Sequence, residues 1–462
     1  GIPWNFSPVL DLGRKPIWSR FFETFGEDVY LGKKMGSALV NGYQGSGSRI
    51  DSLHVAACLK HYVGYSYPTT GRDRTPCLIP KRTMEEYYLP MFKESIDNGA
   101  LTVMINSGEV NGIPGHANKY LLTDVLKTQW GFSGFSVSDW EDLIKLHSEH
   151  LTDSTLKQAI ATAINAGVDM SMVPLSPNYK QYCNLFIELV NEGVISINRL
   201  DDAVRRILIV KQRVGMFENR EPNKSKFSEV GTKKNRDLAR QSVRESLVLL
   251  KNNKEVLPIK RDAKILVVGA EANSLKIQSG GWTLDWQGAN NTNSDFPGSI
   301  TFLQALKEYE NLEITHKNSL SNLDLNKNYD LVIVAYGEEP YAEGIGDRKN
   351  LFYRDSKTLN TLKRLKRNGN KVVSIFFTGR PLWTNEFINL SDAFVVAWLP
   401  GTESRGMTDV LVANDDGSVN TNSLAKYSDM SPTNYQDGSS LKQYIEISAN
   451  VRPSGFQSND SN

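Results

Sequence analysis

The sequence has few cysteines and no long apolar run, and these absences exclude several classes of protein. Its 462 residues include only three Cys, namely Cys58, Cys77 and Cys183. This odd, sparse set does not make a disulfide framework, and no pair has the C-x-x-C spacing of a zinc site. No run of eighteen apolar residues occurs, so the sequence predicts no membrane-spanning helix. The cysteine count does not distinguish an oxidising from a reducing compartment.

An excess of charge of one sign is also missing. Lys and Arg together number 53 against 52 Asp and Glu, so no global field draws the chain to nucleic acid or to an anionic membrane. We therefore expect neither partner. The six His contain no His-x-x-x-His or equivalent ligand set, so no metal or other cofactor is expected. The sequence also lacks a Gly-x-Ser-x-Gly elbow and a Walker loop, which argues against serine hydrolases and P-loop enzymes.

The first half of the chain alternates short apolar runs with longer amphipathic segments. Five runs are typical of strands: Asn5–Leu10, Ala56–Leu59, Leu101–Ile105, Phe135–Val137 and Asp169–Val173. Helices are predicted between them, one over Arg82–Asn98 with Gly99 as C-cap, and one after Asp153 that Gly167 ends. This alternation predicts βα units around a parallel sheet. Five strands are fewer than the eight of a closed barrel.

The second half shows another α/β pattern after a polar stretch, Glu218–Lys234. Four near-continuous apolar runs indicate buried parallel strands: Lys264–Gly269, Asp330–Tyr336, Lys371–Phe377 and Ala393–Trp398. A helix is predicted over Ser356–Leu365, and the chain becomes polar after Asp415. We expect a barrel domain over 1–217, a linker over 218–235, an α/β domain over 236–415 and an irregular tail over 416–462.

Polar residues follow three consecutive strands of the first half. Ala56–Leu59 leads into Lys60 and His61, Leu101–Ile105 into Asn106 and Ser107, and Phe135–Val137 into Ser138 and Asp139. In a βα barrel the reactive groups lie just past the carboxyl ends of the strands. One polar strand end means little, but three in succession favour an active site. For Lys60 and His61 alone, a solvated Lys and a structural His are an equal alternative.

Two loops of the second half also contain residue types that take part in catalysis or ligand binding. The loop Tyr336–Gly344 follows a buried strand and contains three Glu, although an acidic surface loop explains any single one of them. The loop Gly280–Gly288 contains Trp282 and Trp286 between glycines. Two indoles on such a loop are poor core material, so an aromatic platform for a sugar ring is at least as good an interpretation.

Taken together, these segments resemble glycoside hydrolase family 3. The matching stretches occur in family order over about Gly1 to Leu411: Asn5–Asp11 with Trp18–Arg20 and Glu23–Asp28, Leu59–Tyr62, Met104–Gly112 with His116–Asn118, Val137–Trp140, and Gly337–Asp347. The resemblance implies an α/β fold in which an incomplete TIM-like β/α barrel is followed by an α/β sandwich domain. It places the active site in the cleft between the two domains.

The resemblance also implies roles for individual residues. Asp139 resembles the family's nucleophile and Glu343 its general acid/base. Residues that resemble the substrate-binding set are Arg20, Lys60, His61, Met104, Trp140 and Trp286, the two indoles holding the second glucosyl unit. The implied activity is that of a retaining, exo-acting β-glucosidase or β-glucan exohydrolase, which releases glucose from non-reducing ends. The Trp282–Trp286 loop favours a β-glucan over a β-xyloside.

A retaining glycosidase needs one ionised carboxylate and one carboxylic acid, about 5–5.5 Å apart. Their surroundings must move their pKa values in opposite directions. We expect Lys60 and Arg20 to keep Asp139 ionised. Two alternatives stay open: a catalytically impaired, carbohydrate-binding fragment or pseudoenzyme of the same fold, and a periplasmic-type sugar-binding protein of two α/β domains. The latter would not need both carboxylates.

The chain departs from the family pattern at its ends and at one internal position. The family's barrel normally begins before a segment such as Gly1–Trp4, and after Leu411 neither the Gly-Lys-Leu-Pro-like segment nor a fibronectin-like domain follows. A chain truncated at both ends is therefore expected. Ser107 stands where the family often has Tyr. The resemblance further implies secretion or periplasmic residence, whereas linkage preference and oligomeric state stay open.

Overall fold

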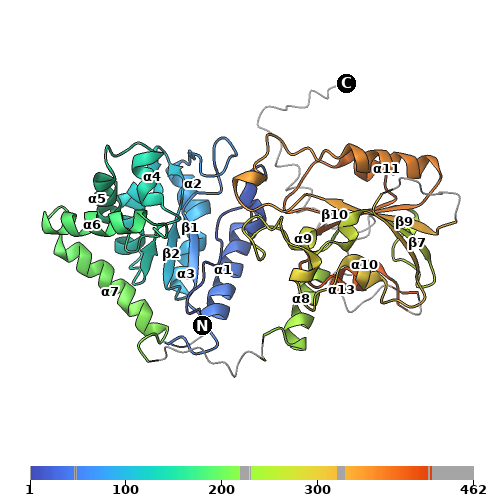
Figure 1. The fold of residues 1–462 in the computed structure, drawn as a ribbon, viewed down its shortest axis with the longest axis horizontal. Coiled ribbons are helices and arrows are strands. Elements are labelled where there is room, and N and C mark those ends of the chain that lie inside the picture. The colour runs from blue at the N-terminus through green and yellow to red at the C-terminus, as the bar shows by residue number, and fades with distance from the viewer. Residues whose placement is uncertain are drawn as a thin grey trace. The chain divides into compact units, whose positions relative to one another are not determined.

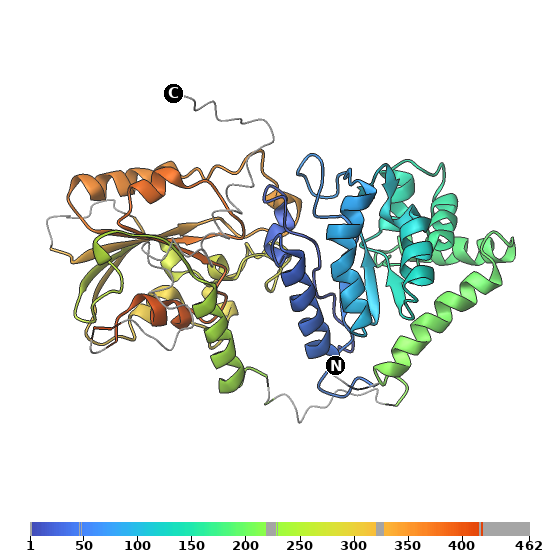
Figure 2. The ribbon, with the colours of Figure 1, turned by 180° about the vertical axis from the view of Figure 1, so that it is seen from behind.

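The computed structural model describes residues 2–45, 47, 49–218, 228, 230–319, 328–414 and 417–418. The chain divides into two compact units, Gly1–Ser225 and Lys226–Asn462 (Figures 1 and 2). The middle of the expected linker, residues 219–227, and the expected tail from residue 419 onward lie outside the described residues. None of the described helices has the length and apolar character needed to cross a membrane. Each unit is described by itself below.

Unit 1 is built on a parallel sheet of three strands in the order β1-β2-β5, namely β1 (Cys58–Tyr62), β2 (Thr102–Ile105) and β5 (Phe135–Val137). Single parallel bridges extend it on both sides, from Val9 to Lys60 and from Met170 to Val137. All five predicted strand segments therefore lie side by side in chain order. The prediction of parallel βα units is confirmed.

The helical segments of unit 1 are η1 (Ser19–Glu23), α1 (Val29–Gln44), α2 (Lys81–Thr83), η2 (Met84–Tyr88), α3 (Leu89–Asp97), η3 (Gly115–Ala117), η4 (Tyr120–Gln129), α4 (Asp142–Ser148), α5 (Leu156–Ala166), α6 (Asn178–Asn191) and α7 (Ile197–Arg213). A short hairpin joins β3 (Glu109–Val110) to β4 (Ile113–Pro114). The two predicted helices correspond to α2–α3 and to α5. Gly99 and Gly167 follow them with φ of 93° and 128°, a backbone conformation that glycine adopts without steric cost.

Both faces of this sheet are packed, which explains its continuous apolar runs. Leu59 and Val103 belong to a large cluster that includes Val40 of α1 and Phe92 of α3. Figure 1 shows these two helices alongside the strands. Side chains alternate along a strand, so the intervening residues Cys58, Met104 and Val137 form a second cluster, which includes Val210 of α7.

Unit 2 contains a six-stranded sheet in the order β6-β11-β10-β9-β7-β8. The strands are β6 (Val248–Asn252), β7 (Lys264–Val268), β8 (Glu313–Lys317), β9 (Leu331–Gly337), β10 (Val372–Phe377) and β11 (Ala393–Trp398). The four central strands are parallel and match the four predicted apolar runs. The edge strands β6, which is antiparallel, and β8 were not predicted, because their residues are only partly buried.

Helices cover both faces of the second sheet (Figure 1). The helical segments are α8 (Lys233–Ser246), η6 (Asn253–Glu255), η7 (Ala270–Asn273), α9 (Leu275–Ser279), η8 (Asn293–Asp295), α10 (Phe302–Leu306), η9 (Gly344–Gly346), α11 (Ser356–Arg367), α12 (Asn385–Asn389) and α13 (Arg405–Leu411). Residues of α8, α10 and α13 pack on one face, and residues of α11 and α12 pack on the other. This three-layer arrangement is the predicted α/β sandwich.

A buried carboxylate fixes the end of β5 in unit 1. Asp169 Oδ2 accepts hydrogen bonds from the backbone N of Ser136 at 2.9 Å and from its Oγ at 3.1 Å. Asp169 Oδ1 binds Lys127 Nζ at 2.6 Å and also the guanidinium of Arg199. One side chain thus ties β5 to the adjacent Met170 segment, to η4 and to α7.

Replacement of Asp169 by Asn should lower the free energy of unfolding by about 3–5 kcal/mol, because two cations lose a buried counter-charge. Asp201 on the same unit is exposed, and Asp201→Asn serves as the control with an expected change within about 0.5 kcal/mol. Urea unfolding followed by circular dichroism measures both variants. Equal stability of the two would contradict the anchoring role of Asp169.

Candidate active site

The polar strand ends of unit 1 converge on Asp139. Lys60 and His61 lie within β1, and Asp139 follows β5 by two residues. The side chains of His61 and Asp139 are 1% and 11% exposed, and His61 Nε2 lies 3.8 Å from Asp139 Oδ2. Lys60 and Arg20 lie within electrostatic reach of the same carboxylate. Burial and the charge of Arg20 lower the pKa of Lys60, an effect that the Asp139 charge opposes, and the charge of Arg20 lowers the pKa of Asp139. The structure therefore brings these four predicted residues together.

The two oxygens of the Asp139 carboxylate differ in their contacts. Oδ1 accepts a hydrogen bond from the backbone N of Trp140 at 2.6 Å. Oδ2 is buried and accepts no hydrogen bond from any described residue. One oxygen is thus held by the backbone, and the other has no hydrogen-bond partner among the described residues. Trp140, which supplies that backbone donor, is 48% exposed.

Asp139 is ionised in spite of its burial. Burial alone would raise the pKa of a carboxyl group. The positive charges of Arg74 and Arg20, with the hydrogen bond from Trp140 and the influence of His116, outweigh that effect and hold the pKa of Asp139 below its ordinary value. The contribution expected from Arg20 is present. Arg74 contributes more, and the sequence did not point to it.

Arg20 is held in one orientation. Its Nε and Nη2 donate to Glu23 Oε1 and Oε2 at 2.7 and 2.9 Å, and its guanidinium carbon lies 5.6 Å from the centre of the Tyr65 ring. The Arg20 side chain is 2% exposed. A bidentate Arg–carboxylate pair fixes the plane of the guanidinium. Glu23 and Tyr65 were not predicted as part of the site.

Two Asp–His pairs flank Asp139. Asp11 Oδ2 lies 2.7 Å from His61 Nδ1 and accepts from the His61 backbone N at 3.2 Å. On the other side, His116 Nε2 accepts from the backbone N of Asp139 at 3.2 Å, and His116 Nδ1 lies 3.8 Å from Asp142 Oδ2. Because Nε2 is an acceptor, the neutral His116 carries its proton on Nδ1, facing Asp142. Asp11 and His116 stand in family-like segments, but neither had a predicted role.

Arg74 and Asp142 complete this cluster. Arg74 Nη1 donates to Ser107 Oγ and lies 3.6 Å from Asp142 Oδ1. Burial and the nearby charge of Asp139 raise the pKa of Asp142 to about 6. Arg74 lies in a loop with φ of 60° and no strand or helix period, so the sequence carries no signal for its position. Ser107, the position that departs from the family pattern, thus binds Arg74 here.

Met104 of unit 1 is packed among apolar side chains. Its side chain is 3% exposed and belongs to the apolar cluster with Cys58 and Val137. Met104 lies in β2, between β1 and β5. Its contacts in the structure are those of a core residue at the sheet, and a substrate contact stays a prediction.

In unit 2, Glu343 lies on a loop that hydrogen bonds from Arg380 hold in place. Glu343 is 9% exposed and directly precedes η9. Arg380 is fully buried, and it donates from Nε to Tyr341 Oη and from Nη2 to the carbonyl of Gly346, both at 2.7 Å. Its Nε also lies 3.3 Å from Glu338 Oε1. The residues on both sides of Glu343 are therefore fixed to a buried cation.

The loop with the two indoles packs against the Glu343 loop. Gln287 Oε1 accepts from the backbone N of Ala342 at 2.8 Å, and a Cβ added at Gly281 would lie 2.0 Å from the Tyr341 carbonyl oxygen. Glycine at that position permits the close approach. Trp282 and Trp286 are 46% and 58% exposed, and the backbone N of Trp282 donates to the Trp286 carbonyl at 3.1 Å. Unit 2 thus presents exposed indoles on a loop bonded to that of Glu343.

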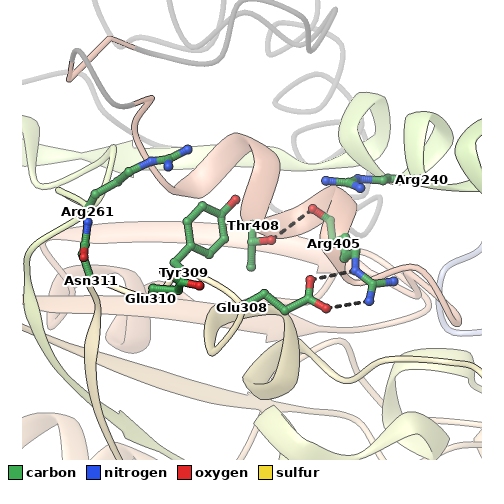
Figure 3. Close-up of a pocket in the computed structure, with 8 residues that line it drawn as sticks. All are labelled: Arg240, Arg261, Glu308, Tyr309, Glu310, Asn311, Arg405 and Thr408. Carbon is green, nitrogen blue, oxygen red and sulfur yellow. Dashed lines mark hydrogen bonds and ion pairs between the residues drawn. The ribbon is translucent and has the colours of Figure 1, made fainter.

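A hollow elsewhere in unit 2 has a volume of about 370 Å³ and includes none of the predicted residues (Figure 3). Its walls are Arg240, Arg261, Glu308, Tyr309, Glu310, Asn311, Arg405 and Thr408. Arg405 donates to both oxygens of Glu308 at 2.7 and 2.5 Å, as Figure 3 shows, and Arg240 Nε donates to Asp409 at 2.6 Å. These pairs neutralise much of its charge. Among the described residues, no three His, Cys, Asp or Glu gather as a metal ion would require.

Known proteins are similar to both units of the chain. Residues 1–210 match the glycosyl hydrolase family 3 N-terminal domain, and residues 247–444 match the glycosyl hydrolase family 3 C-terminal domain. A lysosomal β-glucosidase of Dictyostelium discoideum is 38% identical over 90% of this chain and 53% of its own length. A periplasmic β-glucosidase of Salmonella typhimurium is 30% identical over 89% of this chain and 57% of its own.

A solved structure is similar to both units. A mutant of an exo-1,3/1,4-β-glucanase from a Pseudoalteromonas species is 39% identical, with a TM-score of 0.84 over 91% of this chain and 68% of that one. The chain spans about half the length of the curated relatives it matches. The two domain matches in consecutive order, with these similarities, establish that the chain belongs to glycosyl hydrolase family 3.

Proposed function

We propose that this chain is the catalytic part of a retaining, exo-acting β-glucosidase that releases glucose from the non-reducing ends of β-glucans or β-glucosides. The observation that carries the proposal is the Asp139 carboxylate. It is buried, its pKa is held low by Arg74 and Arg20, and its Oδ2 accepts no hydrogen bond from the described residues. A nucleophile in a retaining glycosidase needs this combination of charge and one available oxygen.

In the proposed mechanism, Asp139 Oδ2 attacks the anomeric carbon and the bond to the leaving oxygen breaks, which gives a covalent glucosyl-enzyme. Glu343 protonates the leaving oxygen and then removes a proton from the water that hydrolyses this intermediate. Arg20, Lys60 and His61 bind glucosyl hydroxyls. Exposed Trp140 and Trp286 offer apolar faces on which a second glucosyl unit stacks.

The named relatives support glucose as the released sugar. Two of them are β-glucosidases and the solved structure is an exo-1,3/1,4-β-glucanase. The exposed Trp282–Trp286 loop fits an extended β-glucan. A sugar-binding protein of two α/β domains is the second candidate, but binding alone does not require a buried, ionised carboxylate with an open oxygen.

The same relatives support a place for the enzyme outside the cytosol. One is called lysosomal and another periplasmic. We propose an extracellular or enclosed compartment of this kind for the chain.

A trapped intermediate tests the proposal most simply. Incubation of the chain with 2,4-dinitrophenyl 2-deoxy-2-fluoro-β-glucoside should add one fluoroglucosyl group, located on Asp139 by peptide mass spectrometry. The Asp139→Asn variant should form no adduct. Binding of glucan oligomers without an adduct and without glucose release would support the sugar-binding protein instead.

Glu343→Ala should separate the acid role from the nucleophile. We expect kcat/KM for cellobiose or laminaribiose to fall about 10²–10⁴-fold, while the first step with 2,4-dinitrophenyl glucoside, whose leaving group needs no proton, is largely spared. The control is Glu339→Ala in the same loop, because Glu339 is 73% exposed. Equal losses on both substrates would contradict the acid role of Glu343.

Arg74→Met should change the pH dependence. Arg74 holds the pKa of Asp139 low, so its removal raises that pKa. Because only the ionised carboxylate reacts, the acidic limb of the kcat/KM profile should move to higher pH, and the activity lost at low pH should return as pH rises. Arg72→Met in the same loop is the control. An unchanged acidic limb in Arg74→Met would show that other groups keep Asp139 ionised.

A further inference from the structure

His61 lies between two carboxylates, and the distribution of protons among them is constrained. Its Nδ1 is 2.7 Å from Asp11 Oδ2, and its Nε2 is 3.8 Å from Asp139 Oδ2. The side chains of His61 and Asp11 are both 1% exposed. Water therefore has little access to either ring nitrogen. A contact there between two acceptors, or between two donors, would be unfavourable because no water could hydrogen-bond to them instead.

A neutral imidazole carries a single N–H, on one of its two nitrogens. If that proton were on Nδ1, Nε2 would present a lone pair to the ionised carboxylate of Asp139, which is unfavourable. If the proton is on Nε2, it faces Asp139, but the short contact between Nδ1 and Asp11 Oδ2 then needs a further proton. Both contacts are satisfied only when the Asp11–His61 pair holds two protons, one shared between them and one on Nε2.

We propose that Asp11 is a positioning residue that keeps this shared proton, so that His61 presents its Nε2–H toward the reactive oxygen of Asp139 and toward a glucosyl hydroxyl beside it. This assignment rests on the proposed function, in which Asp139 is the nucleophile. Asp11 touches no reacting atom and acts through His61 alone.

The surroundings of the pair favour the extra proton at neutral pH. Burial raises the pKa of Asp11 to about 8, against the lowering effect of Arg20. Burial also lowers the pKa of His61, together with nearby cations, so the shared proton stays on the Asp11 side. The titratable or charged groups that face this pair from neighbouring segments are Arg20, Glu23, Lys60, Tyr65, Arg74, Tyr88 and Asp139.

The shared proton makes the tautomer of His61 depend on pH. As pH rises through about 8, the pair loses one proton to solvent. Asp11 is then a carboxylate that accepts the single imidazole proton at Nδ1, and Nε2 loses its proton. The donor toward Asp139 is therefore present below this range and lost above it.

The ring nitrogens of His61 can be observed directly in the full chain by ¹⁵N NMR with labelled histidine, with the His61 signals assigned by their loss in His61→Gln. We expect an Nε2–H tautomer at pH 7 that converts to Nδ1–H above about pH 8. In Asp11→Asn, the backbone N–H of His61, which donates to Asp11 Oδ2 in the unaltered chain, should hold the amide oxygen at that position. That oxygen can only accept, so His61 should carry Nδ1–H already at pH 7. Nδ1–H with a bare Nε2 in the unaltered chain at pH 7 would overturn the proposal.

Kinetics give the second readout. Asp11→Asn should lower kcat/KM for an aryl β-glucoside about 10- to 100-fold, the cost of a lost hydrogen bond to a charged group. The matched control is Asp51→Asn, because Asp51 Oδ1 lies 2.6 Å from His54 Nδ1 in an exposed Asp–His pair. It should change neither kcat/KM nor the His61 tautomer.

Different results would contradict the proposed function and the proposed role of Asp11. The NMR measurement needs no turnover, and the pH titration of the unaltered chain needs no variant that must fold. A chain that shows Nε2–H at His61 but forms no adduct on Asp139 contradicts the proposed function and supports the proton assignment. An adduct together with Nδ1–H at His61 supports the function and overturns the role of Asp11.

Discussion

The site depends on keeping one buried carboxylate ionised. Removing Asp139 from water favours its protonated form, yet the nucleophile that we propose it to be must carry charge at working pH. The charges of Arg74 and Arg20 and the backbone N of Trp140 together outweigh the burial. These groups must hold Asp139 without occupying both of its oxygens. The backbone hydrogen bond to Oδ1 stabilises the charge, while Oδ2 accepts no hydrogen bond from the part of the chain that the structure describes.

The fold of unit 1 places the groups that surround the Asp139 carboxylate. Parallel strands end at the same edge of the sheet, which brings β1 and β5 with their polar residues together. Asp169 ties the end of β5 to its neighbours, and the two Asp–His pairs reach Asp139 from its carboxylate and its backbone sides. In unit 2, Arg380 gives the Glu343 loop a comparable rigidity. Preorganised groups of this kind lower the cost of stabilising charge during reaction.

The sequence predicts the central strands well, since buried parallel strands are apolar on both faces. It does not predict β6 and β8, because their half-buried residues give a sequence pattern like that of a solvent-exposed segment. For the site, strand ends and family-like motifs pointed to His61 and Asp139, which the structure places together. Arg74 was missed because its loop has no periodicity and its role depends on a tertiary contact with Ser107. Asp11 lay in a quoted motif, but its partnership with His61 joins residues fifty positions apart.

The central claim is that Asp139 is a buried carboxylate held ionised by neighbouring cations. The most direct measurement is a ¹³C NMR titration of the chain with labelled aspartate, in which the Asp139 side-chain signal is assigned by its loss in Asp139→Asn. The account predicts that this signal keeps the shift of a carboxylate down to a pH below the ordinary aspartate range. A signal that titrates in or above that range would show that burial outweighs Arg74 and Arg20, and would contradict the account.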